Sequence, residues 1–179
     1  GVEGSVSTLP GSFKEFITEP AQEQAIRDNL WKCVEHIAAL SERTGKALHL
    51  GLEPEPLGYF ETSAETISFF EQLRAEHPND ARLDAHLGVN YDTCHLAVEY
   101  EEAADALGAF RTAGIRISKL HLSAALKVTP DADTRARLKS FEEDVYLHQV
   151  IERQPDGTLT RHRDLDVALA AETNADEWR

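Results

Sequence analysis

The chain has 179 residues, 41% of them hydrophobic, which is enough to bury one ordinary core. Asp and Glu total 32 against 18 for Lys and Arg, so the formal net charge at pH 7 is -14. A surface this acidic repels phosphate backbones, which argues against nucleic acid as a partner and favours a soluble protein over a membrane-surface one. No apolar run approaches the roughly 18 residues of a membrane-spanning helix and no signal-peptide pattern opens the chain, so a cytoplasmic location is expected.

The first predicted elements are a strand, a long helix and a second strand. The first strand covers residues 2–9. Apolar residues then recur at helical spacing from about Glu19 to Thr44, which predicts a helix that stops at Gly45. A short apolar run over residues 47–53 predicts the second strand, and this run ends abruptly in a carboxylate.

The same cycle is repeated in the residues that follow, as expected for βαβ units of a parallel sheet. We predict a helix that begins at Thr62 or Ser63, a strand over 87–92, a helix over 99–113 and a strand over 115–122. Doubly wound sheets and (β/α)8 barrels share this pattern, so periodicity alone does not separate them. Four predicted strands are too few for a closed barrel of roughly 250 residues. Since the chain also begins without Met, we expect a piece of a longer protein.

The pattern then changes. Residues 133–141 predict a helix, while residues 145–153 and 158–163 alternate like the strands of a hairpin around a Pro-Asp-Gly turn. We therefore expect a single domain over residues 1–179, in which about 130–170 form a rim insertion instead of another strand of the main sheet.

Three polar side chains stand where predicted strands finish: Glu53, Asp92 and His121. Because the carboxyl ends of parallel strands share one rim, we expect these side chains to converge. Two carboxylates and one imidazole suit a divalent metal such as Mn²⁺, Mg²⁺, Co²⁺ or Zn²⁺ and leave coordination positions open for substrate. Each residue also has an ordinary interpretation, as a solvated loop Glu, a helix-capping Asp and a hydrogen-bonded core His.

The runs that hold these residues resemble the later strand motifs of a known superfamily. Leu52-Glu53, Asp92–His95 and Lys119–His121 are similar to motifs of the xylose isomerase-like TIM barrels, which include sugar phosphate isomerases and epimerases and endonuclease IV-type enzymes. The resemblance implies a (β/α)8 TIM barrel, present here as a C-terminal partial barrel with a rim hairpin. It also implies metal ligands at Glu53, Asp92 and His121, and a substrate contact at His95.

A closer resemblance covers nearly the whole chain. Val6–Pro10, Leu52–Pro56, His121–Ser123, Tyr146–Val150 and Asp164-Leu165 are similar to segments of the EboE-type metabolite-traffic proteins of bacterial ebo operons. This resemblance implies that the chain processes or moves a small metabolite.

Other residues are weaker candidates for chemistry. The epimerase-type enzymes place a second Glu six residues after the first, where this chain has Tyr59, so we name Glu61 as the candidate base. His95 is the other candidate catalytic residue. His49 and His148 are candidate substrate-binding residues.

Three functions are compatible with these patterns. The leading hypothesis is a metal-dependent isomerase- or epimerase-like enzyme that acts on a small polyol, sugar or related metabolite. The second is a non-enzymatic binding or traffic protein of the EboE type, favoured by the missing epimerase Glu. The third is phosphodiester cleavage in the manner of endonuclease IV, against which the net charge of -14 argues.

Overall fold

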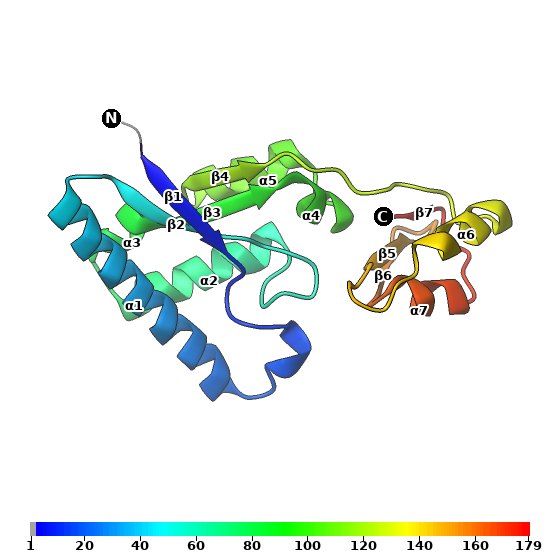
Figure 1. Ribbon diagram of the computed structural model, residues 1–179, viewed down its shortest axis with the longest axis horizontal. Helices are drawn as coiled ribbons and strands as arrows, with labels where there is room; N and C mark the ends of the chain where they lie inside the picture. Colours follow the sequence, from blue (N-terminus) through cyan, green and yellow to red (C-terminus); the bar gives the residue numbers. More distant parts are fainter. Residues whose placement is uncertain (1–2) are drawn as a thin grey trace.

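The computed structural model describes residues 3–179 and shows an α/β protein with two sheets (Figure 1). The first part of the chain contains β1 (Gly4–Thr8), the 3-10 helix η1 (Lys14–Phe16), α1 (Pro20–Thr44), β2 (Leu48–Leu52), α2 (Ser63–Glu76), α3 (Ala81–His86), β3 (Leu87–Asp92), α4 (Thr93–Val98), α5 (Ala103–Thr112) and β4 (Ile117–His121). The last part contains α6 (Ala132–Leu138), the 3-10 helix η2 (Lys139–Phe141), β5 (Val150–Arg153), β6 (Leu159–His162), α7 (Leu165–Ala170) and β7 (Glu177–Trp178).

The larger sheet is parallel throughout and keeps the strands in chain order, β1-β2-β3-β4. The smaller sheet is antiparallel, with the order β6-β5-β7, and Figure 1 shows it with α6 and α7 at one end of the molecule. The predicted alternation of strands and helices, and the parallel sheet that it indicates, are confirmed. Of the predicted first strand, residue 2 lies outside the described residues.

The expected (β/α)8 TIM barrel, present as a C-terminal partial barrel with a rim hairpin, is wrong for this chain. The parallel sheet has four strands and is open, because β1 and β4 each have a ladder partner on one side. The hairpin of β5 and β6 belongs to a separate sheet instead of a barrel rim. At 179 residues the chain is also shorter than the roughly 250 residues that eight βα units need.

Helix α1 begins and ends on local signals that the sequence carries. The Glu19 side chain and Gln22 form a reciprocal capping box at its start, and Pro20 occupies the first turn, where no amide hydrogen is needed. Gly45 ends the helix in the left-handed conformation, with φ of 64°. The predicted helix from Glu19 to Thr44 is therefore confirmed.

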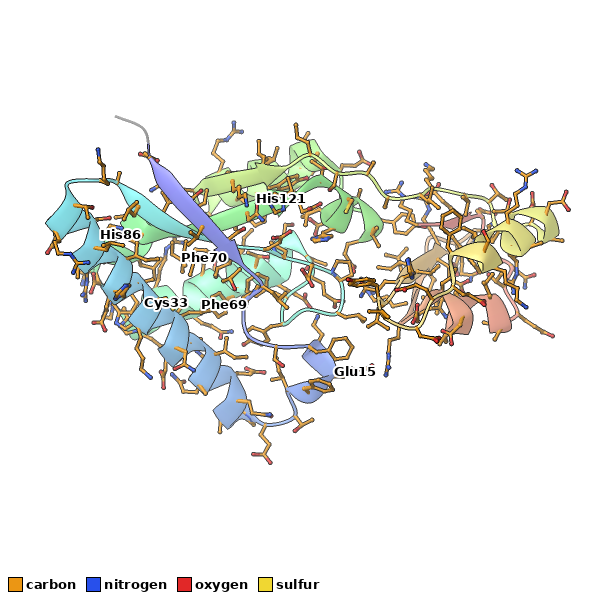
Figure 2. The ribbon with its side chains drawn as sticks, viewed as in Figure 1. Glu15, Cys33, Phe69, Phe70, His86 and His121 are labelled. Atoms are coloured by element: carbon orange, nitrogen blue, oxygen red, sulfur yellow. The ribbon has the colours of Figure 1, made fainter. Side chains whose placement is uncertain are left out.

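The main core lies against one face of the parallel sheet. Leu52 and Val89 of the two central strands are fully buried, and α1, α2 and α5 cover them. Phe69 and Phe70 of α2, labelled in Figure 2, belong to this core. Because side chains alternate along a strand, the residues next to Leu52 point to the opposite face of the sheet.

That opposite face carries two glycines of the central strands, Gly51 and Gly88, and is curved. A Cβ added to Gly88 would lie 2.4 Å from Cγ of Arg116 and 2.4 Å from Oγ of Ser118. The two edge strands approach each other across this face, where the Lys119 amine donates to the Ser7 hydroxyl at 3.1 Å. The curvature therefore brings the ends of non-neighbouring strands close together.

The C-terminal unit, residues 128–179, has a separate hydrophobic cluster. Its largest member is Trp178, which is 1% exposed and donates its ring N–H to the buried Glu152 carboxylate at 3.1 Å. Several polar contacts join this unit to the rest of the chain, among them those of Tyr100 and Glu99. The Tyr100 hydroxyl lies 3.2 Å from the Ile151 carbonyl, and Arg161 pairs with Glu99 at 2.5 Å. Among the described residues, no helix is both long and apolar enough to cross a membrane.

Candidate metal centre

Three neighbouring strands deliver Glu53, Asp92 and His121 to one edge of the parallel sheet. Glu53 follows β2 directly, and its backbone N–H continues the ladder by donating to the Thr8 carbonyl at 3.0 Å. Asp92 and His121 are the last residues of β3 and β4 and are register partners. Since the strands are parallel, these three positions are at the same edge.

The donor atoms of these side chains converge as the sequence predicts. Nδ1 of His121 lies 3.2 Å from Oε1 of Glu53 and 3.4 Å from Oδ2 of Asp92. One ligand atom from each of the three residues lies within 4.8 Å of the others. Two ligands held at about 2.1 Å from one metal ion are about 3.0 to 3.4 Å apart, so these separations fit a shared divalent cation. His121 is labelled in Figure 2 on the β4 side of the sheet.

The two carboxylate oxygens of Asp92 have different partners: Oδ1 caps a helix and Oδ2 faces the candidate metal site. Oδ1 accepts a hydrogen bond from the Cys94 backbone N–H at 2.9 Å and another from the Ser123 hydroxyl, so Asp92 caps α4. Oδ2 remains directed at His121. Burial alone would raise the pKa of Asp92, but the hydrogen bonds from Ser123 and Cys94 outweigh it and lower the pKa. Asp92 is therefore an ionised carboxylate at neutral pH, and it is both a helix cap and a candidate ligand.

Asn90 orients the Glu53 carboxylate, a role that the sequence interpretation missed. Its side chain is fully buried, and its amide nitrogen donates to Oε2 of Glu53 at 2.5 Å. The same nitrogen lies 3.2 Å from Nδ1 of His121. The signal was present in the sequence, because Asn90 precedes Asp92 by two residues in a strand and so shares its face.

A second group of donors adjoins the first. Glu53, Glu55 and His95 also bring one ligand atom each within 4.8 Å of one another, with Nδ1 of His95 3.5 Å from Oε1 of Glu53. Asp92, Cys94 and His95 meet the same criterion. Burial raises the pKa of Glu55, opposed by His95 and reinforced by Glu53 and Asp92. Burial also raises the pKa of the Cys94 thiol, so Cys94 is not an activated nucleophile.

Glu61, the predicted base, occupies different surroundings. One of its oxygens accepts from the Lys14 amine at 2.5 Å, and the other accepts from the Leu57 backbone N–H at 2.6 Å. Lys14 also pairs with Glu65 at 2.9 Å. Burial opposes the charge on Lys14, yet its contacts with Glu61 and Glu65 prevail and raise its pKa. The Glu61 carboxylate is thus held in an ion pair, and it is in none of the candidate ligand groups.

The two histidines predicted to bind substrate are also apart from the donor groups. His49 is buried within β2, with Nε2 3.5 Å from the Glu3 carboxylate, and burial followed by the charge of Arg116 lowers its pKa. His148 donates its backbone N–H to Asp164 at 2.9 Å and lines a cavity of about 180 Å³ between the C-terminal unit and Val98. Both assignments stay predictions.

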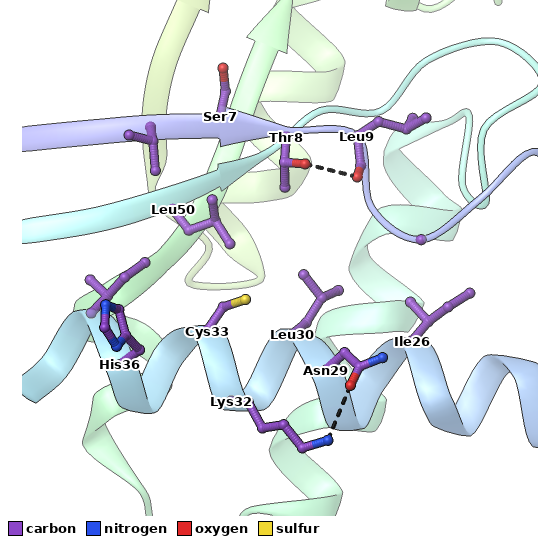
Figure 3. A pocket seen from close by; sticks show the side chains of 13 residues that line it. Ser7, Thr8, Leu9, Ile26, Asn29, Leu30, Lys32, Cys33, His36 and Leu50 are labelled. Atoms are coloured by element: carbon purple, nitrogen blue, oxygen red, sulfur yellow. Dashed lines mark hydrogen bonds between the residues drawn. The ribbon is translucent and has the colours of Figure 1, made fainter.

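A groove with an apolar lining lies elsewhere in the described part of the protein. It has a volume of about 640 Å³ and separates α1 from β1 (Figure 3). Figure 3 shows Ile26 and Leu30 of α1 facing this space, with Leu50 of β2 opposite. Leu50 and Glu53 are three residues apart, so their side chains point to opposite faces of the sheet. The groove is therefore on the core-facing side. Its lining is mainly apolar and holds none of the candidate ligands.

The chain matches no protein-family model, and a search of curated proteins finds no match either. The resemblance to xylose isomerase-like and EboE-type proteins therefore stays a prediction. The function of the protein has to be inferred from the chemistry of Glu53, Asp92, His121 and their neighbours.

Proposed function

We propose that this protein binds a divalent cation through Glu53, Asp92 and His121 and uses it to act on, or to hold, a small polar metabolite. The proposed chemistry is that of metal-dependent sugar isomerases and epimerases. The observation that carries the proposal is the convergence of three donor atoms within 4.8 Å from three neighbouring strand ends. This donor set of carboxylate oxygens and one imidazole nitrogen suits Mn²⁺, Mg²⁺, Co²⁺ or Zn²⁺.

The charge balance of the cluster also favours a cation. Glu53, Glu55 and Asp92 bring carboxylates close together in a partly buried place. Within residues 3–179, none of these three forms an ion pair with Lys or Arg within 4.0 Å. Like charges at short range disfavour ionisation of one another, and a divalent cation removes that repulsion.

The surrounding residues hold the ligands in place. Asn90 fixes one oxygen of Glu53, and Ser123 fixes one oxygen of Asp92, so each carboxylate presents its other oxygen to the centre. A divalent cation bound there would polarise the oxygen atoms of a substrate. His95, whose side chain is 26% exposed beside Glu53, is placed to contact such a substrate.

A second candidate function is metabolite binding without catalysis, as in a traffic protein of the EboE type. The observation that favours it is the ion pair between Glu61 and Lys14, because a carboxylate held in this way is not free to move a substrate proton. Cleavage of nucleic acid has no comparable support, since the net charge of -14 repels the phosphate backbone.

Cation binding is tested by calorimetric titration of metal-stripped protein with Mn²⁺. We expect wild type to bind Mn²⁺, and Glu53→Ala, Asp92→Ala and His121→Ala each to weaken binding by about 100-fold or more, since each removes a direct ligand. His36→Ala, on the exposed surface of α1, is the matched control and keeps wild-type affinity. Absence of binding in wild type, or equal affinity in the ligand variants, contradicts the proposal.

The two candidate functions are separated with the metal-loaded protein. A panel of aldoses, ketoses and polyols is screened for turnover and for saturable binding. Turnover that Glu53→Gln abolishes supports the isomerase or epimerase. Saturable binding without turnover supports the traffic protein.

A further inference from the structure

We propose that the protein binds a small hydroxylated hydrocarbon, of the size and chemistry of a phenol, in the cavity where the C-terminal unit meets Val98. His148 binds the hydroxyl group of this ligand. The inference does not depend on the proposed cation, because the lining of the cavity includes none of the candidate metal ligands among the described residues. It gives the protein a second binding site, separate from the candidate metal centre.

The cavity has room for one small ring. Its volume is about 180 Å³. An apolar protein cavity of about 150 Å³ stays dry and holds a benzene molecule. Sites for larger ligands have volumes of roughly 300 to 1,000 Å³. The occupant is therefore limited to about one six-membered ring with a small substituent.

Most of the lining is apolar. The ring of Trp178 belongs to it, and because the ring N–H is bound to Glu152, the indole keeps no free donor for a ligand. Leu138 of α6, Val150 of β5 and Leu165 of α7 are further buried members of the lining. A sugar or other polyol is a poor occupant, because several of its hydroxyl groups would have no partner there.

Part of this apolar lining is left in contact with water. Leu126 and Phe141 line the cavity, yet they are 58% and 53% exposed. Apolar surface is stabilised when it is removed from water. A ring bound against these two side chains would cover that surface.

His148 supplies one polar atom that the protein does not satisfy. Its Nδ1 is buried and has no hydrogen-bond partner among the described residues. The backbone of the same residue is fixed, because its N–H donates to Asp164 at 2.9 Å. A buried polar atom without a partner is unfavourable, so a ligand that bonds to this nitrogen is stabilised. A hydroxyl group suits it in either tautomer of the ring, because a hydroxyl both donates and accepts.

The charge of the lining favours a neutral ligand over an anionic one. Arg179 also lines the cavity, but its Nε donates to the Glu177 carboxylate at 2.6 Å. Its Nη1 donates to the Ala97 carbonyl at 2.9 Å. This guanidinium is therefore already paired, and a hydroxyl group fits the site better than a carboxylate.

The cavity and the candidate metal centre are at opposite ends of α4. Asp92 caps the start of this helix, and Val98, its last residue, lines the cavity. A helix of 6 residues is about 9 Å long, which is longer than a phenol molecule. One such molecule does not reach both sites, so the cavity binds a ligand of its own.

The test is a titration of the full-length chain with phenol and, in parallel, with benzene, followed in ¹H–¹⁵N NMR spectra. The two tryptophans, Trp31 and Trp178, give separate indole N–H signals, which Trp31→Phe assigns. We expect both ligands to shift the Trp178 signal saturably. The Trp31 signal should stay in place, because Trp31 belongs to the other hydrophobic cluster.

Two variants locate the ligand. Ala125→Phe places a ring at the exposed edge of the cavity and should abolish binding of both molecules. Ala124→Phe, exposed in the same loop but outside the lining, is the matched control and should bind both. His148→Phe keeps a ring but removes the nitrogen, so phenol should bind about 3- to 10-fold more weakly while benzene binding does not weaken.

The opposite results would overturn the inference. A Trp178 signal that neither ligand shifts, or binding that persists in Ala125→Phe, rules out this cavity as the site. Equal effects of His148→Phe on phenol and benzene rule out His148 as the partner of the hydroxyl group. His121→Ala, which removes a candidate cation ligand, should still bind phenol, and loss of binding there would contradict the independence of the two sites. The dispersion of the amide signals confirms that each variant is folded.

Discussion

The two oxygens of Glu53 face different partners, and Asn90 sets which one faces the site. The Asn90 amide nitrogen holds Oε2 at 2.5 Å, while Oε1 is left toward His121 and His95. The carbonyl oxygen of the same amide is buried without a hydrogen-bond partner, an arrangement that costs about 1 to 3 kcal/mol. Because this unpaired carbonyl lowers stability, we infer that Asn90 serves to orient Glu53 in the candidate site.

Asn90→Ala should weaken the binding of Mn²⁺ without unfolding the protein. Loss of a residue that orients a metal ligand typically costs about 10- to 100-fold in affinity. Calorimetric titration gives the affinity, and urea unfolding of the same variant tests the fold. Asn29→Ala, on the surface of α1, serves as the control. Wild-type affinity in Asn90→Ala would show that the contact is incidental.

Part of the candidate site follows from the sequence and part does not. Glu53, Asp92 and His121 are each found by locating a strand end, which is a local property. The choice between Glu55 and Glu61 depends on the path of the loop between them. Leu57 adopts a positive φ of 65° there, and its N–H binds Glu61, which turns that carboxylate toward Lys14. Residue counting does not reveal such a turn.

At the scale of elements, α4 couples the site to the fold. Asp92 ends β3 and caps α4, so the strand, the helix and the metal ligand share one residue. The capping interaction requires a side-chain oxygen, whereas cation binding also requires the negative charge. Substitutions at this position can therefore separate the two roles.

Asp92→Asn and Asp92→Ala should differ in stability but not in cation binding. Asn caps a helix about as well as Asp, so Asp92→Asn should retain stability, while Asp92→Ala should lose about 0.5 to 2 kcal/mol of unfolding free energy. Both should lose Mn²⁺ affinity. Urea unfolding and titration measure the two quantities independently. Equal stability of the two variants would mean that the cap contributes nothing.

The strands of the parallel sheet were predictable, whereas several short helices were not. The strand over 87–92 is confirmed residue by residue as β3. Helices α3 and α4 were not predicted, because each has 6 residues and so shows too little periodicity to detect. Strand β7 has 2 residues and exists through its pairing with β5, a long-range contact that no local pattern indicates.

At the scale of the whole molecule, ion pairs at the junction take the place of a continuous core. The two hydrophobic clusters are separate, and the Glu99 side chain, which is fully buried, meets Arg161 of β6 at 2.5 Å. Whether a parallel βα pattern closes into a barrel depends on strand number and on pairing between distant ends. The sequence pattern gives four strands but no information on pairing between distant ends, and the expected partial barrel came from a resemblance and not from this pattern.

Glu99 should make stability fall as pH rises. Burial raises its pKa above the ordinary value of 4.5, although Arg161 opposes the shift. Because the folded state then binds the proton more tightly than the unfolded state, this contribution is complete below pH 4.5 and is lost as pH rises through the folded-state pKa.

Glu99→Gln removes this dependence, because it cannot ionise yet still offers an oxygen to Arg161. We expect the variant to be at least as stable as wild type at neutral pH and to show a flatter pH profile in urea unfolding. Glu102→Gln, exposed at the start of α5, is the control and should follow wild type. A variant with the wild-type pH profile would contradict the assignment.

The most direct measurement is anomalous X-ray diffraction from crystals of the metal-stripped protein soaked in Mn²⁺. We expect a peak about 2.0 to 2.2 Å from the donor atoms of Glu53, Asp92 and His121. A crystal in which these three side chains converge as described, but which shows no peak between them at saturating Mn²⁺, would contradict the proposed cation site.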